Sequence, residues 1–304
     1  MKALVVITGP TGVGKTKTAI EIAKWLHTEI VNADSRQIYK GIPIGTAAPT
    51  EEELNAVRHH LTGILPLTEY YSASLFEETA LTVISNLHET HDDVVMSGGS
   101  MMYIDAVCNG IDDIPTIDDE TRQLLKHRYE QEGLEPLLRE LQEKDPEYYD
   151  IVDRNNHKRV VHAMEIITMT GKTYTSFRTN TRKQRPFQII KIGLTREREE
   201  LYSRINQRVL EMIRLGFEEE ARRVYPMRHC NSLNTVGYKE MFDYIDGKWS
   251  LQECIERIQG NTRRYCRKQL TWYKRDPEIT WFHPDDVSSI QDYIIGKKQQ
   301  IINN

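Results

Sequence analysis

Cysteine is scarce in this sequence, and long apolar runs are absent from it. The 304 residues include four cysteines, which form no C-x-x-C pair and have no histidine cluster at ligand spacing. This pattern argues against a disulfide framework and against a structural zinc site. We expect no signal peptide, because the first apolar run is short and leads directly into a glycine-rich loop, and no stretch is apolar for long enough to span a bilayer. We therefore expect a cytoplasmic protein with no membrane partner. Separately, we expect a monomer.

The sequence also lacks a strong charge of either sign. It has 40 Lys and Arg against 45 Asp and Glu, which gives a formal net charge of −5. Taken globally, this balance argues against a polyanionic partner. The basic residues are unevenly distributed, however, and two regions of the chain collect them.

A glycine-rich segment near the start carries the clearest chemical signal. The residues Gly9-Pro10-Thr11-Gly12-Val13-Gly14-Lys15-Thr16, here called the phosphate loop, match the pattern G-x-x-x-x-G-K-[ST]. They follow the apolar run 3–7 and precede a segment with helical periodicity, which predicts a strand, a loop and a helix. Backbone N–H groups of such a loop bind a di- or triphosphate, with Lys15 as a point charge and Thr16 as a ligand of Mg²⁺.

Polar residues follow the next two predicted strands. Asp34 ends a short strand-like run, at the sheet edge where ligands bind in open α/β folds, although an N-cap or a solvated turn is the alternative interpretation. The run 92–97 leads through Gly98 and Gly99 to Ser100, whose hydroxyl and N–H we expect to face the phosphate site. Motor and switch NTPases usually end such a strand with an Mg²⁺-binding aspartate, and this chain has Ser97 instead.

Helix signals dominate the middle of the chain. We predict an α/β fold, a P-loop NTPase-like parallel-sheet core formed by residues 1–110 and 187–304, with a helical insertion at residues 111–186. Capping boxes are predicted at Thr50–Glu53, Ser74–Glu77 and Ser250–Glu253. The insertion carries two basic runs, which indicate an anionic partner. Their residues are Arg154, His157, Lys158, Arg159, His162, Arg178, Arg182, Lys183 and Arg185.

The second basic region is the end of a long helix predicted from Leu251 to about Lys274. Residues 261–275 contain six basic residues, three aromatic residues and no acidic one. Cations and stacking surfaces of this kind suit a nucleic-acid backbone and unstacked bases. The alternative is a solvated basic face with aromatic residues in the core.

Five segments, in this order, resemble motifs of the bacterial tRNA dimethylallyltransferases. They are the phosphate loop, 34–41 running into 44–47, 98–103, 236–239 and 267–272. The resemblance covers nearly the whole chain, and the ordered set is more specific than any one motif. It implies a P-loop core with a helical insertion. It also implies transfer of a dimethylallyl group from its diphosphate, with Mg²⁺, to the exocyclic amine of the adenine 3′ of the anticodon in tRNA.

The resemblance also implies roles for particular residues. Asp34 matches the general base, and Ser100 stands at a position near the diphosphate where threonine is usual. His162 stands where the family often has arginine. The positions that match tRNA-contacting residues are Asp34, Ser35, Arg36, Gln37, Arg122, Lys158, Arg159, Val160, Val161, His162, Lys239, Arg267, Lys268, Gln269, Thr271 and Trp272.

Other functions remain compatible with the phosphate loop. A small-molecule or nucleotide kinase would use the loop with Asp34 as a base for a hydroxyl group, but it needs no basic-aromatic helix. A non-catalytic RNA-binding NTP switch would need the aspartate that is missing after the strand at 92–97. A prenyltransferase acting on free adenine nucleotides is disfavoured by the same basic regions.

Overall fold

The computed structural model describes residues 2–179 and 181–302. The chain forms two compact units. Residues up to 109 and from 184 onward form the first unit, and residues 110–183 form the second. None of the helices in the described ranges combines the length and apolar character that a bilayer-spanning helix needs.

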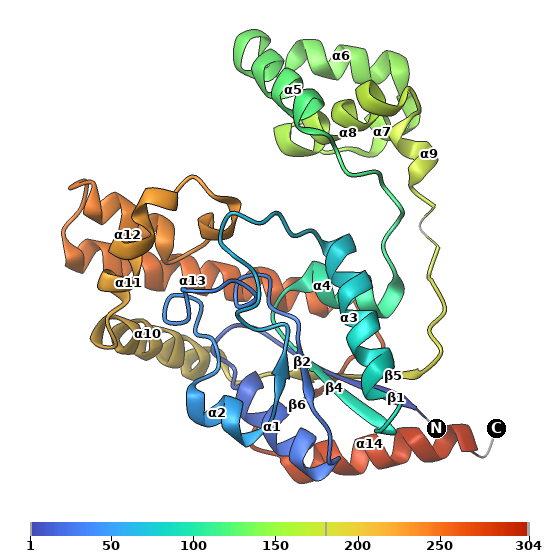
Figure 1. The fold of residues 1–304 in the computed structure, drawn as a ribbon, viewed down its shortest axis with the longest axis vertical. Helices are drawn as coiled ribbons and strands as arrows, with labels where there is room; N and C mark the ends of the chain where they lie inside the picture. The colour runs from blue at the N-terminus through green and yellow to red at the C-terminus, as the bar shows by residue number, and fades with distance from the viewer. Residues whose placement is uncertain (1, 180, 303–304) are drawn as a thin grey trace. The chain divides into compact units, whose positions relative to one another are not determined.

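A parallel sheet forms the centre of the first unit (Figure 1). Its strands are β1 (Ala3–Thr8), β2 (Ile30–Asn32), β3 (His59–His60), β4 (Asp93–Ser97), β5 (Gln188–Leu194) and β6 (Thr280–Phe282). They lie in the order β3-β2-β4-β1-β5-β6, with Val5 of β1 paired to Val95 of β4 and to Ile190 of β5. The α/β parallel-sheet core predicted from the sequence is confirmed. The strands β3 and β6 are too short for an alternating pattern to show in the sequence.

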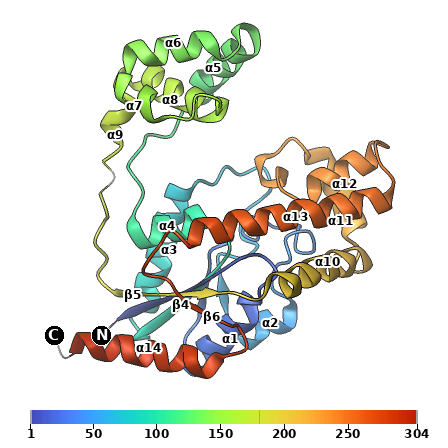
Figure 2. The same cartoon turned by 180° about the vertical axis from the view of Figure 1, so that it is seen from behind.

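Helices cover both faces of this sheet, as Figures 1 and 2 show. Side chains alternate along β1, so that Leu4 and Val6 enter one hydrophobic cluster and Val5 and Ile7 enter the other. The first cluster includes α3 (Ala73–Leu87), α4 (Met101–Asn109), α11 (Phe217–Val224), α12 (Tyr238–Ile245) and part of α13 (Leu251–Tyr273). The second includes α1 (Lys15–Trp25), α14 (Val287–Ile302) and the first half of α10 (Arg198–Arg214).

Two of the three predicted capping boxes are confirmed. Thr50 caps α2 (Glu51–Ala56) and Ser250 caps α13, each with the reciprocal glutamate bond. The third prediction is wrong, because Ser72 caps α3 through the backbone N–H of Leu75. The predicted partner, Glu77, is buried and instead accepts a hydrogen bond from Arg185 at 2.7 Å.

The second unit consists of helices around its own core. They are α5 (Asp119–Glu132), α6 (Glu135–Lys144), α7 (Pro146–Ile151), α8 (His157–Thr170) and α9 (Tyr174–Phe177). Leu125, Leu137 and Met164 lie in this core and are fully buried. Asp145 caps α7 and also accepts bonds from the backbone and hydroxyl of Thr175, which ties the end of the unit to its middle.

One predicted boundary of the insertion needs correction. Residues 184–186 belong to the first unit, because Arg185 donates hydrogen bonds to the carbonyl groups of Ala106 and Val107 as well as to Glu77. Its side chain is only 9% exposed. Arg185 is therefore a buried structural residue, and its assignment to a basic surface for an anionic partner was wrong.

Candidate active site

The phosphate loop connects β1 to α1 and lines a cavity of about 350 Å³. Gly14 precedes the helix with φ of 114°, a conformation that side chains with a Cβ rarely adopt. Gly9 is equally constrained, because a Cβ there would lie 2.7 Å from the carbonyl oxygen of Leu194. The two glycines let the loop turn tightly while Thr11, Lys15 and Thr16 line the cavity.

Lys15 is half-buried and lines this cavity. Its Nζ donates hydrogen bonds to the carbonyl oxygens of Gly9 and Pro10 at 3.1 and 3.0 Å. Burial lowers the pKa of Lys15 to about 8, with the negative charge of Asp34 acting in the opposite direction and the positive charge of Arg208 lowering it further. A negatively charged ligand in the cavity would stabilise the protonated form of Lys15.

Asp34 follows β2 and faces the same place. Its Oδ1 accepts hydrogen bonds from the backbone N–H groups of Arg36 and Gln37, at 2.9 and 3.3 Å, so the turn interpretation is correct for this oxygen. The other oxygen, Oδ2, lies on the cavity side. A Cβ placed on Gly99 would lie 3.8 Å from it and 3.6 Å from Lys15 Nζ. The carboxylate and the ammonium group therefore lie close to the same point, next to Gly99, where a Cβ would clash only with Nε2 of Gln269, at 2.8 Å.

A second cavity, of about 360 Å³, adjoins the first. Asp34, Thr11, Arg208 and Tyr265 line both. Burial raises the pKa of the Tyr265 hydroxyl to about 12. The second cavity also has polar and apolar walls of its own: Ser35, Arg36, Ser100, Val209, Met212, Val236, Lys239, Ile258 and Thr262. Asp34 thus lies where the cavity of the phosphate loop meets a cavity with both polar and apolar walls.

Ser100 does not occupy the position expected from the sequence. It lines the second cavity, and its hydroxyl accepts a hydrogen bond from the backbone N–H of Ser35 at 2.7 Å. Its own N–H donates to the carbonyl oxygen of Ala33. Since both groups bond to the turn around Asp34, Ser100 positions that carboxylate rather than facing the phosphate loop.

Arg36 and Gln37 have protein partners as well. Arg36 donates to the carbonyl oxygens of Asn231 and Ser232, the nearer at 2.7 Å. The side-chain amide of Gln37 donates to the carbonyl oxygens of Thr46 and Ala47. Both side chains therefore already bond to backbone carbonyl groups of the protein. Their direct contact with tRNA stays a prediction.

The residues of α13 that were predicted to contact tRNA fall into two groups, those that bond within the protein and those that are exposed. Gln269 is only 1% exposed, accepts a hydrogen bond from the Thr11 N–H and donates to the carbonyl oxygen of Gly99, both at 2.8 Å. Trp272 donates to Asp105 of α4 at 2.9 Å. Gln269 lines the first cavity and links the phosphate loop to the end of β4, and its contact with RNA stays a prediction. Arg264, Arg267, Lys268 and Thr271 are exposed.

Two arginines of α10 had no predicted role. Arg204 Nε donates to the carbonyl oxygen of Gly12 at 3.0 Å, and Arg208 donates to the hydroxyl of Thr11. Burial lowers the pKa of Arg208. The spacing of these two arginines could have indicated a shared role, because residues four positions apart lie on one face of a helix. Only the packing of α10 against the phosphate loop shows what that face meets.

In the second unit, residues predicted to contact tRNA line one hollow of about 400 Å³ between α5 and α8. Arg122, Lys158, Val161 and His162 are among them. Arg159 is exposed on the same helix, α8. Val160 is fully buried in the core of this unit, so its predicted contact was wrong.

Comparison with known proteins identifies relatives along the whole chain. The family model of IPP transferases matches residues 37–276. A tRNA dimethylallyltransferase of Phocaeicola vulgatus is 62% identical over 96% of this chain and 97% of its own length. One of Parabacteroides distasonis is 58% identical over 99% of this chain and 100% of its own length.

Solved structures of tRNA-modifying transferases are also similar to this chain. The crystal structure of a full-length tRNA isopentenylpyrophosphate transferase from Bacillus halodurans is 36% identical, with a TM-score of 0.73 and complete coverage of both chains. A eukaryotic dimethylallyltransferase acting on tRNA is 25% identical, with a TM-score of 0.82, and covers all of this chain and 80% of its own.

Proposed function

This chain belongs to the IPP transferase family, and we propose that it transfers a dimethylallyl group from dimethylallyl diphosphate to N6 of the adenine on the 3′ side of the anticodon in tRNA. It is a prenyltransferase that modifies tRNA. The observation that supports the detailed mechanism is the place of Asp34, beside Lys15 and between the two cavities.

The first cavity suits the diphosphate. The N-terminus of α1 and the Lys15 ammonium group lie at this cavity before reaction, so they would stabilise the negative charge that grows as the diphosphate leaves. Thr16 lines the same cavity, and its hydroxyl is the kind of oxygen that would hold Mg²⁺ together with substrate phosphates. The bound ion would neutralise part of the diphosphate charge.

The second cavity suits the adenine. Its amine is a weak nucleophile because the nitrogen lone pair is delocalised into the ring. As the bond from N6 to the first carbon of the dimethylallyl group forms, the bond from that carbon to the diphosphate oxygen breaks, and the Asp34 carboxylate takes the proton from N6. Ser100 and Ser35 hold this carboxylate through the turn described above. The adenine must leave the stacked anticodon loop to reach it, at a cost of a few kcal/mol.

Exposed basic residues are available for the tRNA backbone. Arg264, Arg267 and Lys268 are exposed on α13, and Lys239 lines the second cavity. Lys158, which lines the hollow of the second unit, is exposed as well. A small-molecule kinase has no need of these surfaces.

One assay decides between transfer and phosphorylation. Purified protein receives Mg²⁺, radiolabelled dimethylallyl diphosphate and unmodified tRNA, without ATP. We expect the label on tRNA. No transfer, together with ATP-dependent phosphorylation of a small molecule, would establish the kinase instead.

A further inference from the structure

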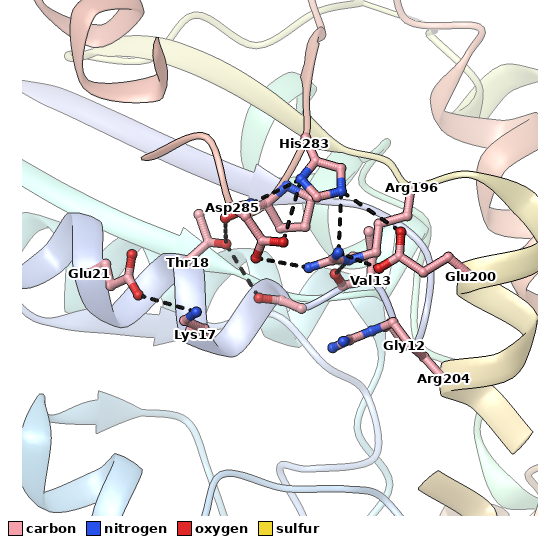
Figure 3. A network of polar contacts seen from close by, with 12 residues as sticks. Gly12, Val13, Lys17, Thr18, Glu21, Arg196, Glu200, Arg204, His283 and Asp285 are labelled. Carbon is pink, nitrogen blue, oxygen red and sulfur yellow. Dashed lines mark hydrogen bonds and ion pairs between the residues drawn. The ribbon is translucent and has the colours of Figure 1, made fainter. Parts of the chain in front are cut away.

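Arg196 contacts the phosphate loop at Val13, and neither residue is part of the cavity lining. It lies between β5 and α10, and its side chain is 7% exposed. Its Nε donates a hydrogen bond to the carbonyl oxygen of Val13 at 2.9 Å, and Arg204 donates to the neighbouring carbonyl of Gly12 (Figure 3). Val13 does not line the cavity, whereas Gly14 does.

The remaining nitrogens of Arg196 bond to side chains from two parts of the chain. NH1 donates to Glu200, in the first turn of α10, and lies 3.2 Å from Nε2 of His283, while NH2 donates to Asp285 at 3.0 Å (Figure 3). Two carboxylates therefore neutralise the guanidinium. A charge paired in this way contributes orientation rather than a free positive charge for the phosphate.

Residues 283–285, which follow β6, pack against the same loop. Thr18 of α1 donates a hydrogen bond from its hydroxyl to the carbonyl oxygen of Pro284 at 3.2 Å, and this contact is buried. A Cβ on Gly14 would lie 3.6 Å from Pro284 Cβ and 3.9 Å from Arg196 NH2. The loop is thus supported from outside by Arg196 and by a segment about 270 positions away in sequence.

The planar peptide group converts this outer contact into an effect on the cavity. In a trans peptide, the carbonyl of one residue and the N–H of the next point in opposite directions. A carbonyl of Val13 held outward by Arg196 directs the N–H of Gly14 toward the cavity. We propose that Arg196, clamped by Glu200, His283 and Asp285, is a positioning residue that keeps the Val13–Gly14 peptide in the orientation that binds diphosphate. The proposal rests on the function given above.

The test compares Arg196→Ala with the full-length parent enzyme. We expect the KM for dimethylallyl diphosphate to rise about 10- to 100-fold, the loss associated with one hydrogen bond to a charged group, because the peptide can then turn its carbonyl toward the phosphate. The kcat should fall as well, since the N–H stabilises the leaving group more strongly in the transition state. The KM for tRNA should stay within twofold of the parent value.

Two further variants make the result specific. Arg196→Lys keeps a donor for Val13 but cannot bond to both carboxylates, so its KM for the diphosphate should lie between those of the parent and the alanine variant. Arg214→Ala removes an exposed arginine from the same helix, which pairs with Glu211, and should match the parent.

Three outcomes would overturn the proposal. The first is a folded Arg196→Ala enzyme with the parent KM and kcat for the diphosphate. The second is an equal loss of affinity for the diphosphate and for tRNA together with a lower melting temperature, which would indicate a general structural role. If the alanine variant does not fold, a parent-like KM in Arg196→Lys counts in the same way. A parent enzyme that neither binds dimethylallyl diphosphate nor transfers it contradicts the proposed function instead.

Discussion

Gln269 accepts a hydrogen bond from the backbone N–H of Thr11 at 2.8 Å, across 258 positions of sequence. Through its other side-chain atom it donates to Gly99. One buried amide thus joins the phosphate loop, the end of β4 and the helix α13, three segments that meet only in the folded chain.

Removing this amide should weaken both the fold and the phosphate site. Gln269→Ala leaves a buried N–H and a buried carbonyl without partners, so we expect the free energy of unfolding to fall by about 1–3 kcal/mol. Denaturant titration measures this change. The KM for dimethylallyl diphosphate should rise, while the KM for tRNA changes little. Gln252→Ala, at an exposed position of the same helix, is the control and should match the parent.

Asp34 is expected to be the general base. Asp34→Asn keeps the Oδ1 bonds to the backbone of Arg36 and Gln37 but removes the basicity. Single-turnover rates of transfer should fall about 10²–10⁴-fold. The affinity for tRNA should be nearly unchanged. An asparagine variant that transfers at the parent rate would remove Asp34 from the mechanism.

Ser100 should act through Asp34. Ser100→Thr keeps the oxygen that accepts the Ser35 N–H and should be tolerated, whereas Ser100→Ala loses it and lets the turn move. We expect the alanine variant to lose kcat more than it raises the KM for the diphosphate. The opposite pattern, a raised KM with a normal kcat, would restore the direct phosphate contact expected from the sequence.

Binding of dimethylallyl diphosphate should weaken at alkaline pH. The pKa of Lys15 in the free enzyme is about 8, and a bound diphosphate raises it by stabilising the ammonium form. The charged lysine is therefore present below pH 8, and the KM should be flat there and rise as the pH passes 8. The measurement is the KM for dimethylallyl diphosphate from pH 6.5 to 9.5. Lys15→Arg does not titrate in this range and should lose the rise, whatever its absolute KM.

The affinity for tRNA should depend steeply on salt because of the exposed cations of α13. Reversing Arg264, Arg267 and Lys268 to Glu should flatten the slope of log K against log salt concentration by about 2–3, since each lost phosphate contact removes about 0.7–0.9. Arg263 is best left in place, because it donates to Asn206 of α10. Reversal of Lys2 and Lys24, exposed before β1 and in the last turn of α1, is the control. A slope that changes equally in both variants would argue against this surface.

Local patterns in the sequence predicted much of the fold and some of the site. The run at 3–7, the glycines of the phosphate loop and the caps Thr50 and Ser250 depend on residues close in sequence, and the structure confirms them. The cap predicted at Ser74 was wrong because α3 begins at Ala73, directly after Ser72, while Glu77 bonds to Arg185, 108 positions away. Short strands such as β3 were not predicted for a different reason, since two residues are too few to show a periodic pattern.

By itself, the sequence determined that a phosphate-binding loop opens an α/β core and that Asp34 follows the second strand, because backbone geometry and strand burial are encoded locally. It also placed the chain among the tRNA dimethylallyltransferases through the order of its motifs. Only the tertiary structure decided which polar side chains face a substrate and which hold the protein together. Gln269, Arg36 and Gln37 have the same chemical character as binding residues, but each bonds to backbone groups. Arg196 has its role because packing brings it against Val13, 183 positions away, and no local pattern records a contact at that distance.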